Sequence, residues 1–82
     1  MMELLHVGFG NMVNADKIVA VVSPDGAPIK RLVSHAKEEG RTIDASAGRK
    51  TKAVIIMENG NVVLSALLPE TIRGRTGVDD DE

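Results

Sequence analysis

Short runs of β-branched residues, separated by glycine, proline and asparagine, constrain the fold more than any other feature of this sequence. Residues 17–22 and 53–57 are the clearest of these runs, and each predicts a β-strand. We expect residues 17–22 to be buried on both faces, because their apolar side chains are continuous rather than alternating. The Asn59-Gly60 pair, between residues 53–57 and a further apolar run at 62–67, predicts a tight hairpin.

The N-terminal part predicts one strand and one sharp turn. Residues 3–7 are short and largely apolar, which favours a strand. Two glycines and an asparagine follow within residues 8–11, so the backbone there must turn sharply. We expect Phe9 to plug the core or to contact another subunit, and residues 12–16 to continue as irregular backbone.

One main helix is predicted in the middle of the chain. Four apolar residues recur at the spacing i, i+3, i+4 and i+7, which places them on one helical face directed at the sheet. They are Ile29, Leu32, Val33 and Ala36. Pro28 suits the first turn of this helix, and Gly40 suits the position just after its end. Residues 42–44 predict a short strand, and residues 69–73 predict a short final helix.

These elements predict an α+β fold, with a small sheet of about five short strands, one main helix packed on it and a short C-terminal helix. We expect one domain over residues 1–76 and a disordered acidic tail over residues 77–82. A core of this size barely offsets chain entropy. Because the sequence contains no cysteine, disulfides and thiolate zinc sites are excluded, and oligomerisation remains the common way to add stability.

A basic loop lies between two of the predicted strands. Arg49, Lys50 and Lys52 follow a run of small residues at positions 45–48, which lets the backbone approach a partner closely. Asp44 is near enough in sequence to orient these cations by an ion pair. We interpret the loop as a binding site for a polyanion, namely the phosphates of double-stranded DNA. The alternative is a solvated surface, which is the commoner fate of three cations on a loop.

Charge and aromatic content narrow the choice of partner. The formal net charge is -2, but without the four acidic residues at positions 79–82 the balance becomes mildly basic. Phe9 is the only aromatic residue, which disfavours single-stranded nucleic acids bound by base stacking. Contact with duplex DNA through phosphates and a groove remains open.

Catalytic, metal and membrane signals are weak or missing. His6 and His35 do not stand at a metal-ligand spacing, and no serine lies in a nucleophile pattern. We therefore expect no metal, no cofactor and no enzymatic activity. The sequence has no signal-peptide pattern and no apolar run of about 18 residues, so we expect a cytoplasmic, nucleoid-associated protein without a membrane contact.

Several short motifs occur in order from about Val7 to Arg73. They are Gly8-Phe9-Gly10-Asn11, Val22-Ser23-Pro24, Ala27-Pro28-Ile29-Lys30-Arg31, Ile43-Asp44-Ala45, Gly48-Arg49-Lys50-Thr51-Lys52-Ala53-Val54, Leu64-Ser65-Ala66 and Pro69-Glu70-Thr71. As a set, these motifs resemble the RemA family of bacterial regulators of extracellular-matrix genes. The resemblance implies a DNA-binding transcriptional regulator that assembles into a ring and presents basic residues to promoter DNA.

The resemblance also implies roles for single residues. The family's basic loop maps onto Arg49 and Lys50, and its other basic position maps onto Lys17. Arginines commonly stand in the family where this chain has Lys17, Lys50 and Lys52, so we expect fewer bidentate phosphate contacts here. The segment around Pro28 matches closely, which implies that it matters for activity.

We therefore expect a ring-like homo-oligomer of more than two subunits that binds promoter duplex DNA, and whose target genes include matrix or biofilm genes. The predicted DNA contacts are Arg49, Lys50, Lys52, Lys17 and Arg31. The predicted structural or oligomer contacts are Gly8, Phe9, Gly10, Asn11 and Pro28. Two alternatives stay open: a phosphometabolite sensor built on residues 8–11 and Arg49, and a structural oligomerisation module whose basic loop is only solvated.

Overall fold

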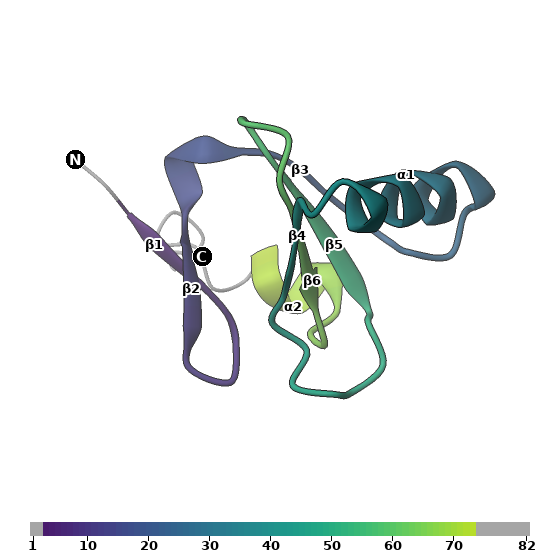
Figure 1. The fold of residues 1–82 in the computed structure, drawn as a ribbon. Helices are drawn as coiled ribbons and strands as arrows, with labels where there is room; N and C mark the ends of the chain where they lie inside the picture. Colours follow the sequence, from purple (N-terminus) through teal and green to yellow (C-terminus); the bar gives the residue numbers. More distant parts are fainter. Residues whose placement is uncertain (1–2, 74–82) are drawn as a thin grey trace.

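The computed structural model describes residues 3–73, which form an α+β fold with two sheets and two α-helices (Figure 1). The strands are β1 (Leu4–Gly8), β2 (Asn11–Asn14), β3 (Ile18–Val22), β4 (Thr42–Asp44), β5 (Ala53–Met57) and β6 (Val62–Ser65). The helices are α1 (Ala27–Glu38) and α2 (Pro69–Arg73), and the 3-10 turn η1 (Ala15–Lys17) joins β2 to β3. The predicted fold class is confirmed. The predicted acidic tail lies outside the described residues.

The main sheet has the strand order β3-β5-β6-β4. Its two central strands, β5 and β6, form the antiparallel hairpin that Asn59-Gly60 predicted, and Gly60 has the positive φ of 91° that such a turn requires. The outer strand β4 pairs with β6 in parallel, after the chain has crossed through α1. Strands β3 and β4 therefore form the two free edges of this sheet.

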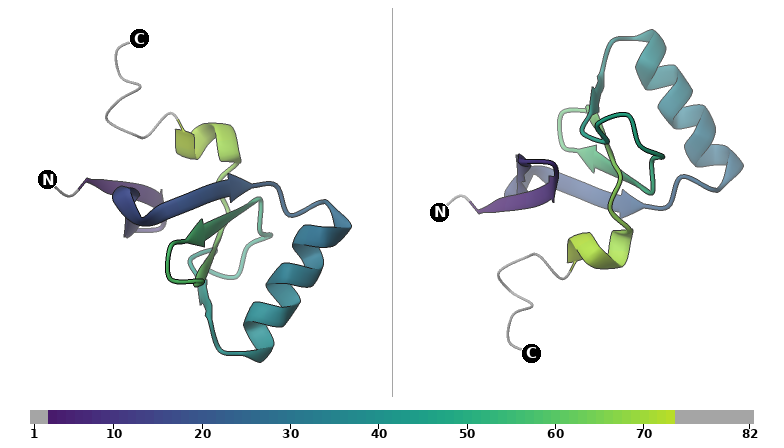
Figure 2. Two further views of the ribbon diagram at one scale, coloured as in Figure 1. Left: turned by 90° about the horizontal axis from the view of Figure 1, so that it is seen from above. Right: turned by 90° about the horizontal axis from the view of Figure 1, so that it is seen from below.

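The molecule has three layers, with the main sheet in the middle. Helix α1 covers one face of the sheet, and the β1–β2 hairpin lies on the opposite side of the molecule in every view (Figure 2). Alternation along β5 explains this arrangement: Ile55 packs with the hairpin and α2, whereas Val54 packs with α1. Both side chains are fully buried. The main helix packs on the sheet as predicted.

Two of the predicted elements were wrong. Residues 12–16 are not irregular throughout, because β2 pairs with β1 and adds a second, two-stranded sheet to the expected one. Residues 17–22 do not form a doubly buried strand either. Strand β3 is an edge, and its Val19 is 67% exposed at a point where the pairing with β5 shifts register. A continuous run of β-branched residues can thus form an edge strand as well as a central strand.

No helix among residues 3–73 is long and apolar enough to cross a membrane.

One buried hydroxyl joins the two sheets. Ser65, at the end of β6, is fully buried and donates a 2.8 Å hydrogen bond to the carbonyl oxygen of Val7 in β1. The hydroxyl oxygen of Ser65 in turn accepts a 3.1 Å hydrogen bond from the backbone N–H of Leu67. Without this hydroxyl, the buried carbonyl of Val7 and the half-buried N–H of Leu67 would lose this partner.

We predict that Ser65→Ala lowers the free energy of unfolding by about 1–3 kcal/mol, the usual cost of leaving buried polar groups unpaired. Urea denaturation followed by circular dichroism, at one fixed protein concentration, measures this change. Ser34→Ala, at an exposed position of α1, is the control and should change stability by less than about 0.5 kcal/mol. Equal stability of the two variants would show that the Ser65 hydroxyl does not stabilise the junction.

Candidate nucleic-acid interface

The basic loop between β4 and β5 is anchored at both ends. At its start, the N–H of Ala45 donates to the carbonyl of Leu64 at 2.8 Å, and Ala45 and Ser46 are buried. At its end, the N–H of Lys52 donates to the carbonyl of Ser65, also at 2.8 Å. Both ends of the loop are therefore held by the neighbouring strand β6.

The loop turns through two successive left-handed residues. Ala47 has a φ of 55° and Gly48 a φ of 81°. Glycine adopts this conformation freely, whereas in alanine it costs about 1–2 kcal/mol. The turn is closed by a 3.0 Å hydrogen bond from the N–H of Arg49 to the carbonyl of Ser46. The run of small residues thus allows a sharp turn, as predicted, and places Arg49 directly after it.

The three cations of the loop are exposed, and none forms an ion pair with another residue of the described chain. The guanidinium carbon of Arg49 lies 5.3 Å from the centre of the Phe9 ring, within the range of a cation–π contact. This contact joins the loop to the turn between β1 and β2. It orients the arginine without neutralising its charge.

Phe9 does not plug the core, so that part of its prediction was wrong. Its side chain is 52% exposed, and its φ of 53° is left-handed. An aromatic residue in this conformation is strained. Asn11 supports the turn by donating from its side-chain amide to the carbonyl of Gly8 at 3.0 Å. The turn holds the ring outward, under Arg49.

Asp44 does not orient the loop cations by an ion pair. Its carboxylate instead accepts hydrogen bonds from the hydroxyl and the backbone N–H of Ser46, at 2.5 and 2.9 Å. The Ser46 hydroxyl, and then the Ser46 N–H, hold the pKa of the Asp44 carboxyl below its usual value, and the charge of Lys37 acts in the same direction. Asp44 therefore fixes the start of the loop rather than its cations.

Lys17 and Arg31 are not brought to the loop within one chain. Lys17 forms an ion pair with Glu58 at 3.3 Å, beyond the far end of β5. At the rise of a strand, Glu58 is roughly 20 Å from Lys52, which precedes the start of β5. Arg31 is exposed on α1, and Pro28 is exposed in the first turn of the same helix. The roles predicted for these residues stay predictions.

A shallow hollow of about 460 Å³ is formed by the loop and the β1–β2 turn. Its lining includes Phe9, Arg49, Lys50 and Lys52, with Ala66 and Leu67 between them. This hollow brings together the three predicted DNA contacts of the loop and one residue predicted to be structural. An exposed, cationic surface of this kind can contact phosphate oxygens directly.

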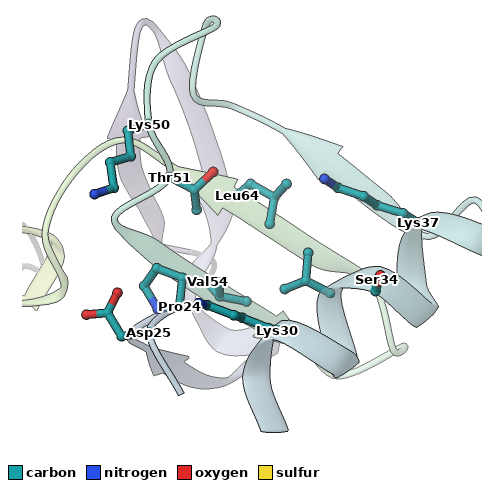
Figure 3. Close-up of a pocket in the computed structure, with 10 residues that line it drawn as sticks. Pro24, Asp25, Lys30, Ser34, Lys37, Lys50, Thr51, Val54 and Leu64 are labelled. Atoms are coloured by element: carbon teal, nitrogen blue, oxygen red, sulfur yellow. The ribbon is translucent and has the colours of Figure 1, made fainter. Parts of the chain in front are cut away.

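Sequence reasoning missed a second cationic surface. A groove between α1 and the main sheet is lined by Lys30 and Lys37 from the helix and by Lys50 from the loop (Figure 3). The spacing of Lys30 and Lys37, seven residues apart, places them on one face of a helix. That spacing was the signal that could have identified the groove.

The fold and the site together define a small α+β protein with an anchored, exposed basic loop. A family model with the description "RemA-like: Extracellular matrix regulatory protein A-like" matches residues 4–76. The chain belongs to this RemA-like family, so the resemblance drawn from its motifs is confirmed.

Similar proteins from several bacteria carry the name "Putative regulatory protein". The relative from Lachnoclostridium phytofermentans is 57% identical over 75 residues, which cover 92% of this chain and 82% of the relative. The relative from Synechococcus elongatus is 60% identical over 72 residues, covering 88% and 83%. The relative from Dictyoglomus turgidum is 54% identical over 81 residues, covering 99% and 95%. The family and these names support a regulatory role.

The lowered pKa of Asp44 predicts how the loop responds to acid. Because the folded-state pKa lies below the usual aspartate value of about 3.9, the stabilisation is complete above that value and is lost as the pH falls through the lower, folded-state pKa. The backbone amide signal of Ser46, followed by nuclear magnetic resonance, should therefore titrate at a pH below 3.9. Asp44→Asn should abolish this titration. A Ser46 midpoint at or above the usual aspartate value would contradict the prediction.

Proposed function

We propose that this protein is a DNA-binding transcriptional regulator that assembles into a ring-like homo-oligomer and contacts promoter duplex DNA through its basic loops. The observation that carries the proposal is the loop itself. Arg49, Lys50 and Lys52 stand together, exposed and without an acidic partner in the described chain, on a backbone anchored at both ends. Anchoring restricts the backbone of the loop, so less conformational entropy is lost when phosphates bind.

The chemistry of the cations suits a duplex. Arg49 offers a planar fork for two phosphate oxygens or for the edge of a guanine, and the lysines supply mobile point charges. The ring of Phe9 orients Arg49, and a single exposed aromatic residue does not make a stacking platform for successive bases. The basic loop therefore fits phosphate and groove contacts better than single-strand binding.

One copy of the loop is too weakly charged to bind DNA tightly. The chain carries ten lysines and arginines against twelve aspartates and glutamates, so attraction to DNA must come from the local loop rather than from the net charge. Repetition of the loop around an assembly adds these contacts, and affinity rises steeply with the number of phosphates engaged. Assembly is thus part of the proposed binding mechanism.

The exposed apolar residues support assembly. Val19 is 67% exposed on edge strand β3, and Ile43 is 52% exposed on the opposite edge strand β4. Edge strands carry unpaired backbone groups that favour pairing with another chain. In the proposed assembly, β3 of one copy meets β4 of the next, and such head-to-tail contacts close into rings when the rotation allows it.

The regulated genes and the location are also proposals. The family description names extracellular matrix regulation, and we extend it to this chain as control of matrix or biofilm genes. A regulator of this kind would act in the cytoplasm, on the nucleoid.

The two alternatives differ in support. A small-ligand sensor is favoured by one observation, because Phe9 and Arg49 line the same hollow. A purely structural module would be favoured by a buried ion pair between Arg49 and Asp44, but Arg49 is exposed and Asp44 bonds to Ser46 instead.

We predict that Arg49→Ala abolishes measurable duplex binding while the fold and the assembly persist. Each lost phosphate contact lowers the salt slope of binding by about one unit, and an assembly repeats the loss at every engaged subunit. Mobility-shift titrations at several salt concentrations, with light scattering on each variant, measure both properties. Lys50→Ala and Lys17→Ala should act in the same direction but more weakly, because lysine lacks the bidentate fork.

The matched control is Arg31→Ala, which removes the same charge from an exposed position on α1. It should weaken binding less than Arg49→Ala does. Duplex affinity and salt slope that are unchanged in Arg49→Ala would show that this loop does not bind DNA, and the structural module would become the preferred reading.

We also predict an assembly larger than a dimer, measured by light scattering at micromolar concentration. Val19→Glu should reduce the mass of the assembly, because it places a charge on the exposed edge of β3. Ser34→Glu adds the same charge on α1, away from both edges, and should leave the mass unchanged. A parent protein with the mass of one chain at every concentration would rule out the assembly.

A further inference from the structure

The groove between α1 and the main sheet has features that the DNA proposal does not use. Its volume is about 450 Å³, which is within the usual range for sites that bind small molecules. Figure 3 shows the lysines of the helix and the loop around an opening whose floor includes Val54 and Leu64. Both floor residues are buried against α1. The groove thus combines an apolar floor with cationic walls.

The cations come from two separate elements. Lys30 and Lys37 stand two helical turns apart on α1, a separation of about 10 Å along the helix axis. Lys50 reaches the same groove from the basic loop. None of the three forms an ion pair within the described chain. Like charges around one concave surface repel each other, and an anion bound between them would offset this repulsion.

Polar groups with other chemistry lie between the cations. Ser34 and Thr51 contribute hydroxyl groups to the lining. Asp25 stands at the rim, where its carboxylate accepts a 3.1 Å hydrogen bond from the hydroxyl of Ser23. A carboxylate at this place repels a continuous phosphate backbone, but it can accept a hydrogen bond from a hydroxyl or amino group. This combination distinguishes the groove from the loop surface beside Phe9.

We propose that this groove binds a small phosphorylated organic molecule of the size of a nucleoside diphosphate. Its phosphates lie between Lys30, Lys37 and Lys50, and its apolar or planar body lies on Val54 and Leu64. A hydroxyl or amino group of the ligand donates to Asp25. The inference does not rest on DNA binding, because the groove lies on the helix side of the loop and shares only Lys50 with the proposed DNA contacts.

The test is isothermal titration calorimetry of the full chain with ADP and with pyrophosphate, in the absence of divalent metals and of DNA. ADP should bind more tightly than pyrophosphate, because only ADP has a body to cover the apolar floor. Lys37→Ala and Lys30→Ala should each weaken ADP binding by about tenfold, the usual effect of losing one charge-assisted contact. Arg31→Ala and Lys52→Ala remove equal charge next to the groove without lining it, and should change the affinity less than about twofold.

Three results would overturn the proposal. The first is a parent protein that binds ADP no better than pyrophosphate, or not at all. The second is a loss of ADP binding in Arg31→Ala or Arg49→Ala that equals the loss in Lys37→Ala, since the anion would then bind non-specifically or in the hollow beside Phe9. The third is a Lys37→Ala variant that keeps ADP binding but lowers the salt slope of duplex binding, which would make the groove part of the DNA surface.

Discussion

The burial of the β5–β6 hairpin on both faces is the constraint on which the rest of the structure depends. Val54 and Ile55 are adjacent in β5, fully buried and turned to opposite sides, so each face of the sheet needs its own cover. Helix α1 covers one face, and the β1–β2 hairpin with α2 covers the other. A chain with almost no aromatic side chains can cover both faces of the sheet because Val, Ile, Leu and Ala pack closely in thin layers.

The same hairpin fixes the geometry of the candidate site. The carbonyls of Leu64 and Ser65, at the end of β6, hold the two ends of the basic loop. The Ser65 hydroxyl also holds β1, and β1 leads directly into the turn that carries Phe9. The loop and the aromatic ring beneath Arg49 are therefore positioned by two neighbouring residues, and the cation–π contact joins two segments separately fixed to β6.

The basic loop contributes to two surfaces. Lys50 lines both the groove on the α1 side and the hollow beside Phe9, whereas Lys52 lines the hollow and not the groove. The distribution of charge over the two surfaces thus depends on the conformation of one lysine. The flexible stem of lysine lets its charge move between the two surfaces.

Local signals in the sequence predicted most of the fold. Helix α1 followed from a 3.6-residue period with Pro28 and Gly40 at its ends, and the hairpin followed from Asn59-Gly60. The position of each strand within the sheet could not be predicted in this way. Strands β3 and β5 have equally apolar sequences, and only the order of strand pairing makes β3 an edge. For the site, the cations of the loop were recognisable, whereas the groove and the contact between Phe9 and Arg49 depend on segments brought together by tertiary packing.

The strand order also affects how the chain can fold while it is being synthesised. Strands β3 and β4 are made first, but each pairs in the main sheet only with a central strand that comes later in the chain. A nascent chain that ends before residue 53 has none of the partners of β3 and β4, and the apolar stripe of α1 has no sheet to cover. The main sheet therefore forms only after β5 and β6 have left the ribosome, and until then the emerging chain exposes the apolar stripe of α1 to solvent and to chaperones.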